Sequence, residues 1–202
     1  RVTELPTPAS HASLAQFNSA LANLIRNDPS LLTTPTSKST YGGDQTGELS
    51  LHAGELGELG ELFNDAIGQT IESYLADGMR NHPLMAPASD DWSLRTWGTV
   101  LRSGGKQTSH MHPLGWLSGV YYVRVPEQMG KDGDEAGWLE FGRTPERFFR
   151  KTEREVHRYK PAEGKLLLVP SWLWHQTMPF TADSDRISIA FDVMPKSMLR
   201  VL

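Results

Sequence analysis

Residues 110–125, His-Met-His-Pro-Leu-Gly-Trp-Leu-Ser-Gly-Val-Tyr-Tyr-Val-Arg-Val, place two histidines one residue apart, ahead of a strand-like apolar run. On a β-strand, residues i and i+2 point to the same face, so the imidazoles of His110 and His112 should converge on one point. A third histidine, His175, ends another apolar run. Imidazole is a common ligand of first-row metals, and three protein ligands leave positions for substrate or oxygen. The spacing therefore predicts a metal centre. The alternative is that the histidine pair lies in a loop beside Pro113.

The chain after residue 90 is a series of short strand patterns separated by turn residues. Strands are expected at 92–101, 117–125, 138–141, 165–170 and 186–194. Glycine, proline and polar residues separate them, and no helical pattern alternates with each strand, which favours an antiparallel arrangement. We predict a mainly β (α+β) fold, a double-stranded β-helix or jelly-roll barrel buttressed by N-terminal helices.

The N-terminal part carries two helical patterns. In the first, apolar residues from Leu14 to Ile25 recur at helical spacing, with Ser10 as the expected N-cap. In the second, leucines three residues apart open an amphipathic helix over 54–77. Between them, the Thr-, Ser- and Gly-rich stretch 33–46 is expected to be a loop.

These patterns predict a single domain over 1–202. Residues 1–90 would form a helical support region, and residues 91–202 a jelly-roll core that carries the metal site.

Composition excludes several classes of protein. The formal net charge of −4 gives no basic field for nucleic acid, and no apolar run is long enough to span a bilayer. The sequence contains no cysteine, which excludes disulfides, iron–sulfur clusters and thiol nucleophiles. Any metal must therefore be bound by nitrogen and oxygen ligands. We expect a cytoplasmic protein without nucleic-acid or membrane partners.

Several motifs together resemble the iron(II)- and 2-oxoglutarate-dependent oxygenases. That family's pattern is His-x-Asp/Glu, a distal His, and an Arg-x-Ser about ten residues later. Here Arg186-Ile187-Ser188 begins eleven residues after His175. A narrower subgroup resembles this chain at His110–Pro113, Ser118–Val123, 137–141, 161–164 and 170–175. The resemblance covers roughly residues 92–195 and implies the jelly-roll fold.

The resemblance also implies roles for individual residues. His110, His112 and His175 would bind iron(II) and form the catalytic centre, with 2-oxoglutarate and dioxygen as cosubstrates. Arg186 would hold the far carboxylate of 2-oxoglutarate through two parallel hydrogen bonds, and Ser188, on the same strand face, could add a third.

The alternative for Arg186 is an ion pair with Asp183 or Asp185 at the start of the strand.

This sequence departs from the family pattern at His112, where an aspartate or glutamate is expected. With three neutral imidazoles, bound iron(II) would keep a charge of +2 instead of +1. Three interpretations follow. His112 is a ligand in a three-histidine centre, which we favour. It lies outside the ligand set and a carboxylate such as Glu140 completes the site. Or the centre holds another divalent metal and does not oxidise.

Two other functional classes share these residues. The spacing of Gly104 to His110 and of Gly164 to His175 also resembles the two cupin motifs, which would give a metalloenzyme without 2-oxoglutarate, but the cupin glutamate is missing. A non-catalytic metal-binding jelly-roll module is the third possibility. The oxidised substrate, a small molecule or a side chain, is not revealed, and the edge strands of such a fold leave homodimer formation open.

Overall fold

The computed structural model describes residues 1–36, 38–85, 91–130, 133–148, 152 and 155–196. Its elements, in chain order, are β1 (Val2–Glu4), α1 (Leu14–Arg26), β2 (Leu32–Thr33), β3 (Thr40–Gln45), α2 (Gly54–Ala76), the 3-10 turns η1 (Met79–Asn81) and η2 (Pro83–Met85), β4 (Trp92–Gln107), β5 (Leu117–Arg124), β6 (Leu139–Phe141), β7 (His157–Tyr159), β8 (Lys165–Pro170), β9 (His175–Thr177) and β10 (Arg186–Pro195).

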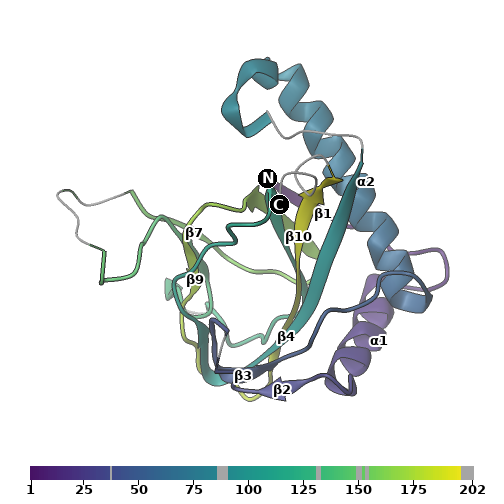
Figure 1. Ribbon diagram of the computed structural model, residues 1–202. Helices are drawn as coiled ribbons and strands as arrows, with labels where there is room; N and C mark the ends of the chain where they lie inside the picture. The colour runs from purple at the N-terminus through teal and green to yellow at the C-terminus, as the bar shows by residue number, and fades with distance from the viewer. Residues whose placement is uncertain (37, 86–90, 131–132, 149–151, 153–154, 197–202) are drawn as a thin grey trace.

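The strands form two antiparallel sheets. The larger has seven strands in the order β1-β8-β5-β10-β4-β3-β2, and the smaller has three in the order β7-β6-β9. Both helices cover the outer face of the large sheet, and the small sheet lies on its other side (Figure 1). The predicted jelly-roll fold class, mostly antiparallel β with N-terminal helices, is confirmed. No helix in the described part of the chain is long and apolar enough to cross a membrane.

Strand β10 has the hydrophobic core, between the large sheet and the helices, on one face and the space between the two sheets on the other. It pairs with β4 on one side and β5 on the other. Because side chains alternate along a strand, Ile187 and Phe191 face the helices and are fully buried, whereas Arg186, Ser188 and Asp192 line a cavity on the inner face. One strand therefore supplies both hydrophobic core and candidate site.

The helices pack on the apolar face of the large sheet. Phe63 of α2 stacks on Phe191 with ring centroids 4.3 Å apart. Tyr121 of β5 points to the helices, and its hydroxyl donates a hydrogen bond to Asn18 Oδ1 of α1 at 2.6 Å. Burying each such aromatic or aliphatic side chain contributes about 1.5–3 kcal/mol, which holds α2 in place although its sequence contains several glycines. The next residue, Tyr122, points inward.

Two local predictions about the N-terminal region are corrected. Helix α1 begins at Leu14, and its N-cap is Ser13, whose side chain accepts from Gln16 N, instead of Ser10. The stretch 33–46, expected to be a loop, contains part of β2 and all of β3. Strand β3 forms because it pairs with β4 over a long range, which its local sequence does not reveal.

The strand expected at 92–101 is longer than predicted, because β4 continues through Gly104 and Gly105 to Gln107. Gly104 adopts a φ of +79°, a conformation that favours glycine. At this point the register between β3 and β4 shifts. The two glycines therefore form an irregularity inside a long strand rather than a turn.

Candidate metal centre and anion pocket

The three predicted histidines come together between the two sheets, but His110 and His112 do not share a regular strand. Strand β4 ends at Gln107, and the histidine pair follows in an extended loop, so the predicted strand position is wrong. The loop is held by backbone hydrogen bonds. His110 exchanges two with His175, at 3.0 and 2.9 Å, and His112 N donates to Ser171 O at 2.9 Å. These bonds orient both rings as a strand would.

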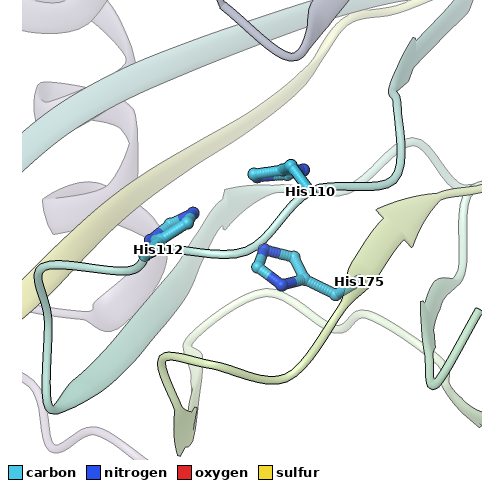
Figure 2. Close-up of side chains that lie close together, drawn as sticks. All are labelled: His110, His112 and His175. Atoms are coloured by element: carbon cyan, nitrogen blue, oxygen red, sulfur yellow. The ribbon is translucent and has the colours of Figure 1, made fainter. Parts of the chain in front are cut away.

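The imidazole rings point toward one another (Figure 2). The ring centroid of His110 lies 4.3 Å from that of His175, and His112 lies 5.1 Å from each of the other two. One ring nitrogen from each residue falls within 4.8 Å of the others. Among the described residues, this cluster has no carboxylate member. The geometry suits a metal ion bound by three nitrogens.

Each ring uses its Nδ1 to hydrogen-bond an oxygen acceptor. His110 Nδ1 lies 2.7 Å from Thr108 O, and His175 Nδ1 lies 2.9 Å from Leu173 O. His112 Nδ1 lies 2.6 Å from a carboxylate oxygen of Asp192. Because these oxygens only accept, we assign the proton of each neutral ring to Nδ1, which leaves the Nε2 lone pair for a metal.

Burial keeps two of the rings neutral. Desolvation lowers the pKa of His110 to about 4 and the pKa of His175 to about 3, and the neighbouring imidazoles add to both shifts. At neutral pH these two rings are therefore in the unprotonated form that binds metals.

The three histidines line a cavity of about 720 Å³ that also contains Arg186 and Ser188. That volume falls within the range of small-molecule sites, roughly 300–1,000 Å³. The walls are mostly apolar. Four tryptophans that lie near the histidines in the sequence or on the following strands are not among the lining residues: Trp116, Trp138, Trp172 and Trp174.

Arg186 is the most unusual residue of the cavity. Its side chain is fully buried, and its guanidinium lies 5.1 Å from the ring centre of Tyr122. Its Nε and Nη1 have no hydrogen-bond partner among the described residues. Burial lowers the pKa of Arg186, because desolvation disfavours the charged form. A buried guanidinium with free donors is a strong site for an anion.

The alternative role for Arg186, pairing with a neighbouring aspartate, does not occur among the described residues. Asp185 instead pairs with Arg26 of α1 at 3.3 Å. Asp183 accepts a hydrogen bond from Gln128 at 3.4 Å.

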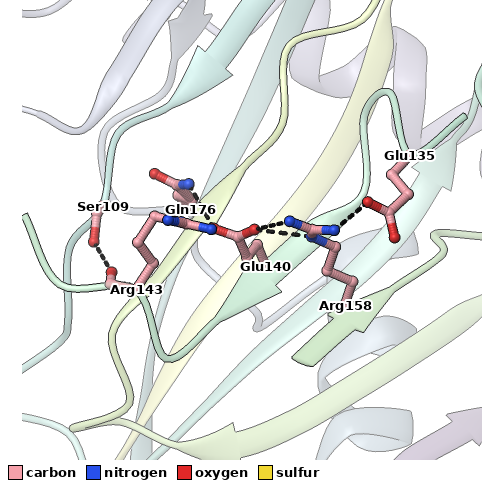
Figure 3. A network of polar contacts seen from close by, with 6 residues as sticks. All are labelled: Ser109, Glu135, Glu140, Arg143, Arg158 and Gln176. Carbon is pink, nitrogen blue, oxygen red and sulfur yellow. Dashed lines mark hydrogen bonds and ion pairs between the residues drawn. The ribbon is translucent and has the colours of Figure 1, made fainter. Parts of the chain in front are cut away.

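Glu140 is not a candidate ligand, which corrects the second interpretation of the site. Its two neighbours on β6, Leu139 and Phe141, line the cavity, so Glu140 points to the opposite face. There Arg143, Arg158 and Gln176 donate hydrogen bonds to it at 2.6, 2.8 and 2.8 Å (Figure 3). Burial raises the pKa of Glu140, but these hydrogen bonds outweigh it, and the net pKa is below its usual range.

The hydrogen bonds of Glu140 with Arg143, Arg158 and Gln176 form a network on the face of β6 that points away from the cavity. Gln176 follows His175 directly, and the backbone oxygen of Arg143 accepts a hydrogen bond from Ser109, the residue before His110 (Figure 3). The network thus ties together the two chain segments that carry these histidines.

Sequence reasoning missed two residues of the site, Asp192 and Trp97. Trp97 lines the cavity, and its ring centroid lies 5.5 Å from that of His112. Asp192 could have been found by continuing the two-residue period of Arg186 and Ser188 along β10. Nothing in the local sequence points to Trp97, which reaches the site only through the pairing of β4 with β10.

Comparisons with known proteins agree on one family. The family model described as "Putative 2OG-Fe(II) oxygenase" matches residues 95–192. A comparison with curated protein sequences finds no match.

Solved structures with the same fold include a prolyl-4-hydroxylase from Pseudomonas putida, with a TM-score of 0.57 and 15% identity, covering 96% of this chain and 91% of that one. A prolyl hydroxylase from Trichoplax adhaerens, in complex with a hypoxia inducible factor peptide fragment, has a TM-score of 0.64 and 12% identity, covering 100% and 86%. HygX from Streptomyces hygroscopicus, with nickel and 2-oxoglutarate bound, has a TM-score of 0.56 and 10% identity, covering 96% and 82%.

The matched segment contains all of the cavity residues singled out above, and enzymes of this family use iron(II), 2-oxoglutarate and dioxygen. Residues 95–192, just under half of the chain, thus match the iron(II)- and 2-oxoglutarate-dependent oxygenases, a family of oxidoreductases.

Proposed function

We propose that the chain is a dioxygenase that binds iron(II) through His110, His112 and His175 and holds 2-oxoglutarate with Arg186 and Ser188. The proposed reaction is hydroxylation, and the substrate is a small molecule or a side chain. The observation that carries the proposal is the unpaired, buried guanidinium in the same cavity as three converging imidazoles.

The residues present fit both groups. Three neutral imidazoles suit iron(II) and would leave three of six octahedral positions free. With its far carboxylate on Arg186, 2-oxoglutarate would satisfy Nε or Nη1 donors that have no described partner in the protein. When bound, the iron centre supplies an oxidation that balances: 2-oxoglutarate, dioxygen and a C–H substrate give succinate, carbon dioxide and the hydroxylated product.

The chain's own residues would bind and orient 2-oxoglutarate and exclude water from the cavity. Burial raises the pKa of Tyr122 to about 12, against the opposing effect of the neighbouring Arg186, so its phenol stays protonated. This proton is available to an anion beside Arg186. The apolar cavity walls, among them Leu167 and Val169, keep water from the guanidinium, which strengthens its attraction for a carboxylate.

One titration tests the proposal. Anaerobic protein loaded with iron(II) should develop a charge-transfer absorption band when 2-oxoglutarate is added, and admitting air should produce succinate. Arg186→Met should abolish the band without abolishing iron binding. Arg26→Met, which removes a cation from the partly exposed pair with Asp185, is the matched control and should retain the band.

Two results would contradict the proposal. Iron binding with no band at any 2-oxoglutarate concentration would favour the cupin-type alternative. Failure to bind any divalent metal would favour a non-catalytic binding module in which the metal is absent. The lack of cysteine is compatible with a cytoplasmic location, which is part of the proposal.

A further inference from the structure

A carboxylate lies beside the histidine that replaces the family's carboxylate ligand. His112 Nδ1 is 2.6 Å from Asp192 Oδ1. The corresponding acceptors of His110 and His175 are neutral backbone oxygens. His112 is therefore chemically distinct from the other two rings, because only its Nδ1 proton is shared with a full negative charge in this cluster.

The structure fixes Asp192 in this position. Ser118 lies opposite Asp192 in the register of β5 and β10, and its hydroxyl donates to Asp192 Oδ1 at 2.7 Å. Ser118 Oγ is in turn 2.8 Å from Ser171 Oγ. The side chains of His112 and Asp192 are only 13% and 15% exposed, so water screens their interaction weakly.

The charge of Asp192 is not neutralised by an arginine or lysine among the described residues. Arg95 lies opposite Asp192 in the register of β4 and β10, but its guanidinium pairs with Glu48 at 3.5 Å. His112 is the one basic side chain of the described residues found in an ion-pair contact with Asp192.

We propose that Asp192 is the anionic member of the metal centre and acts through His112 as a positioning residue. By accepting the Nδ1 proton, it fixes the ring and makes Nε2 a better donor to the metal. Iron(II) with three neutral imidazoles carries a charge of +2, and Asp192 brings the sum to +1, the value of a two-histidine, one-carboxylate site. In this chain the carboxylate is not itself a metal ligand but is hydrogen-bonded to the ligand His112.

This inference rests on the three-histidine metal site of the proposed function, and it is tested by metal binding without 2-oxoglutarate. Affinity for cobalt(II) is measured by competition with a chelator, and the visible absorption of bound cobalt(II) reports its ligand field. Asp192→Asn keeps an oxygen that can accept from His112 but removes the charge. Asp192→Ala removes both.

Asp192→Asn should weaken cobalt(II) binding about 10–100-fold and shift the absorption bands, and Asp192→Ala should weaken it further. Asp65→Asn, which removes the same charge from an exposed position on α2, is the matched control and should bind as the unaltered protein does. The thermal unfolding of the metal-free variants identifies any loss of fold.

If Asp192→Asn binds cobalt(II) within twofold of the unaltered protein and with the same spectrum, the inference is wrong. If neither Asp192 variant folds, Ser118→Ala decides: it leaves the carboxylate but removes its hydrogen-bond donor, and unchanged affinity and spectrum would overturn the proposal. An unaltered protein that binds no metal refutes both this inference and the proposed function. One that binds metal but not 2-oxoglutarate refutes only the latter.

Discussion

Replacing Arg186 by methionine should have opposite effects on stability and on cosubstrate binding. The guanidinium is fully buried, and its Nε and Nη1 lack described partners. An unsatisfied buried donor costs about 1–3 kcal/mol, and the stacking contact with Tyr122 returns up to about 2 kcal/mol. An apolar side chain of similar length removes both contributions. With two such donors, the net effect of Arg186→Met is a stabilisation of the cosubstrate-free protein by about 3 kcal/mol at mid-range, which is a Tm rise of roughly 6–12 °C.

Binding of 2-oxoglutarate should change in the other direction. Removing one partner of a buried charge pair costs about 2–5 kcal/mol, so the Kd should rise by a factor of roughly 30 to several thousand. At a 2-oxoglutarate concentration of about 100 times its Kd, the unaltered protein gains about 2.7 kcal/mol of stability. The variant should gain about 0.9 kcal/mol or less at that concentration.

Thermal unfolding of the iron-loaded, oxygen-free proteins, with and without 2-oxoglutarate, measures both effects. The variant should melt higher without the cosubstrate and should lose most of its Tm response to it. Arg26→Met, which breaks a partly exposed pair, should change stability by about 1 kcal/mol or less and keep the full response. A variant that is destabilised like any core deletion, yet still responds to 2-oxoglutarate, would refute the assignment of Arg186 as an anion site.

Three further predictions concern the support of the site. The pKa values of His110 and His175 lie below the unfolded value of 6.5, so the unfolded chain binds more protons than the folded protein as the pH falls. In the metal-free protein, the contribution of these two neutral rings to stability is therefore complete above pH 6.5. It is lost progressively as the pH drops toward 4. Urea unfolding at pH 7 and pH 5 should show a loss of up to about 2 kcal/mol per histidine, and His175→Gln should remove about half of the difference. Glu140→Gln should destabilise the protein by about 1–3 kcal/mol and weaken metal binding, as measured by unfolding and chelator competition; unchanged values would show that the network does not support the centre. Phe63→Ala should cost about 3–5 kcal/mol in the same unfolding assay while cobalt(II) affinity, measured well below the new Tm, stays constant.

The strands of the core could be predicted where their own residues alternate or are uniformly apolar. β8 coincides with the expected range 165–170, and β10 differs from its expected range by one residue. β3 could not be predicted, because its Tyr-Gly-Gly-Asp sequence has weak strand propensity and the strand depends on pairing with β4. The sequence pattern therefore predicts a strand where the residues of that strand are themselves buried. It does not predict a strand that forms only because it pairs with a strand far along the chain.

The candidate site likewise contains residues that the sequence predicts and contacts that it does not. The histidine spacing and Arg-x-Ser motif are short-range signals, and the structure brings all five of those residues to one cavity. The contact between His112 and Asp192 joins residues 80 positions apart, and no local pattern encodes it. The rejection of Glu140 likewise required knowing which face of β6 turns toward the cavity.

The two faces of β10 restrict how this protein can change. A single inserted or deleted residue in the turn before Arg186 that shifted the strand by one position would place Ile187 and Ile189 in the cavity and move Arg186 and Asp192 to the face that packs on the helices. Length changes there would therefore abolish folding and ligand binding together. Engineering aimed at a new substrate is better directed to the cavity rim around Leu32 and Leu114, which are exposed and contribute little to the core.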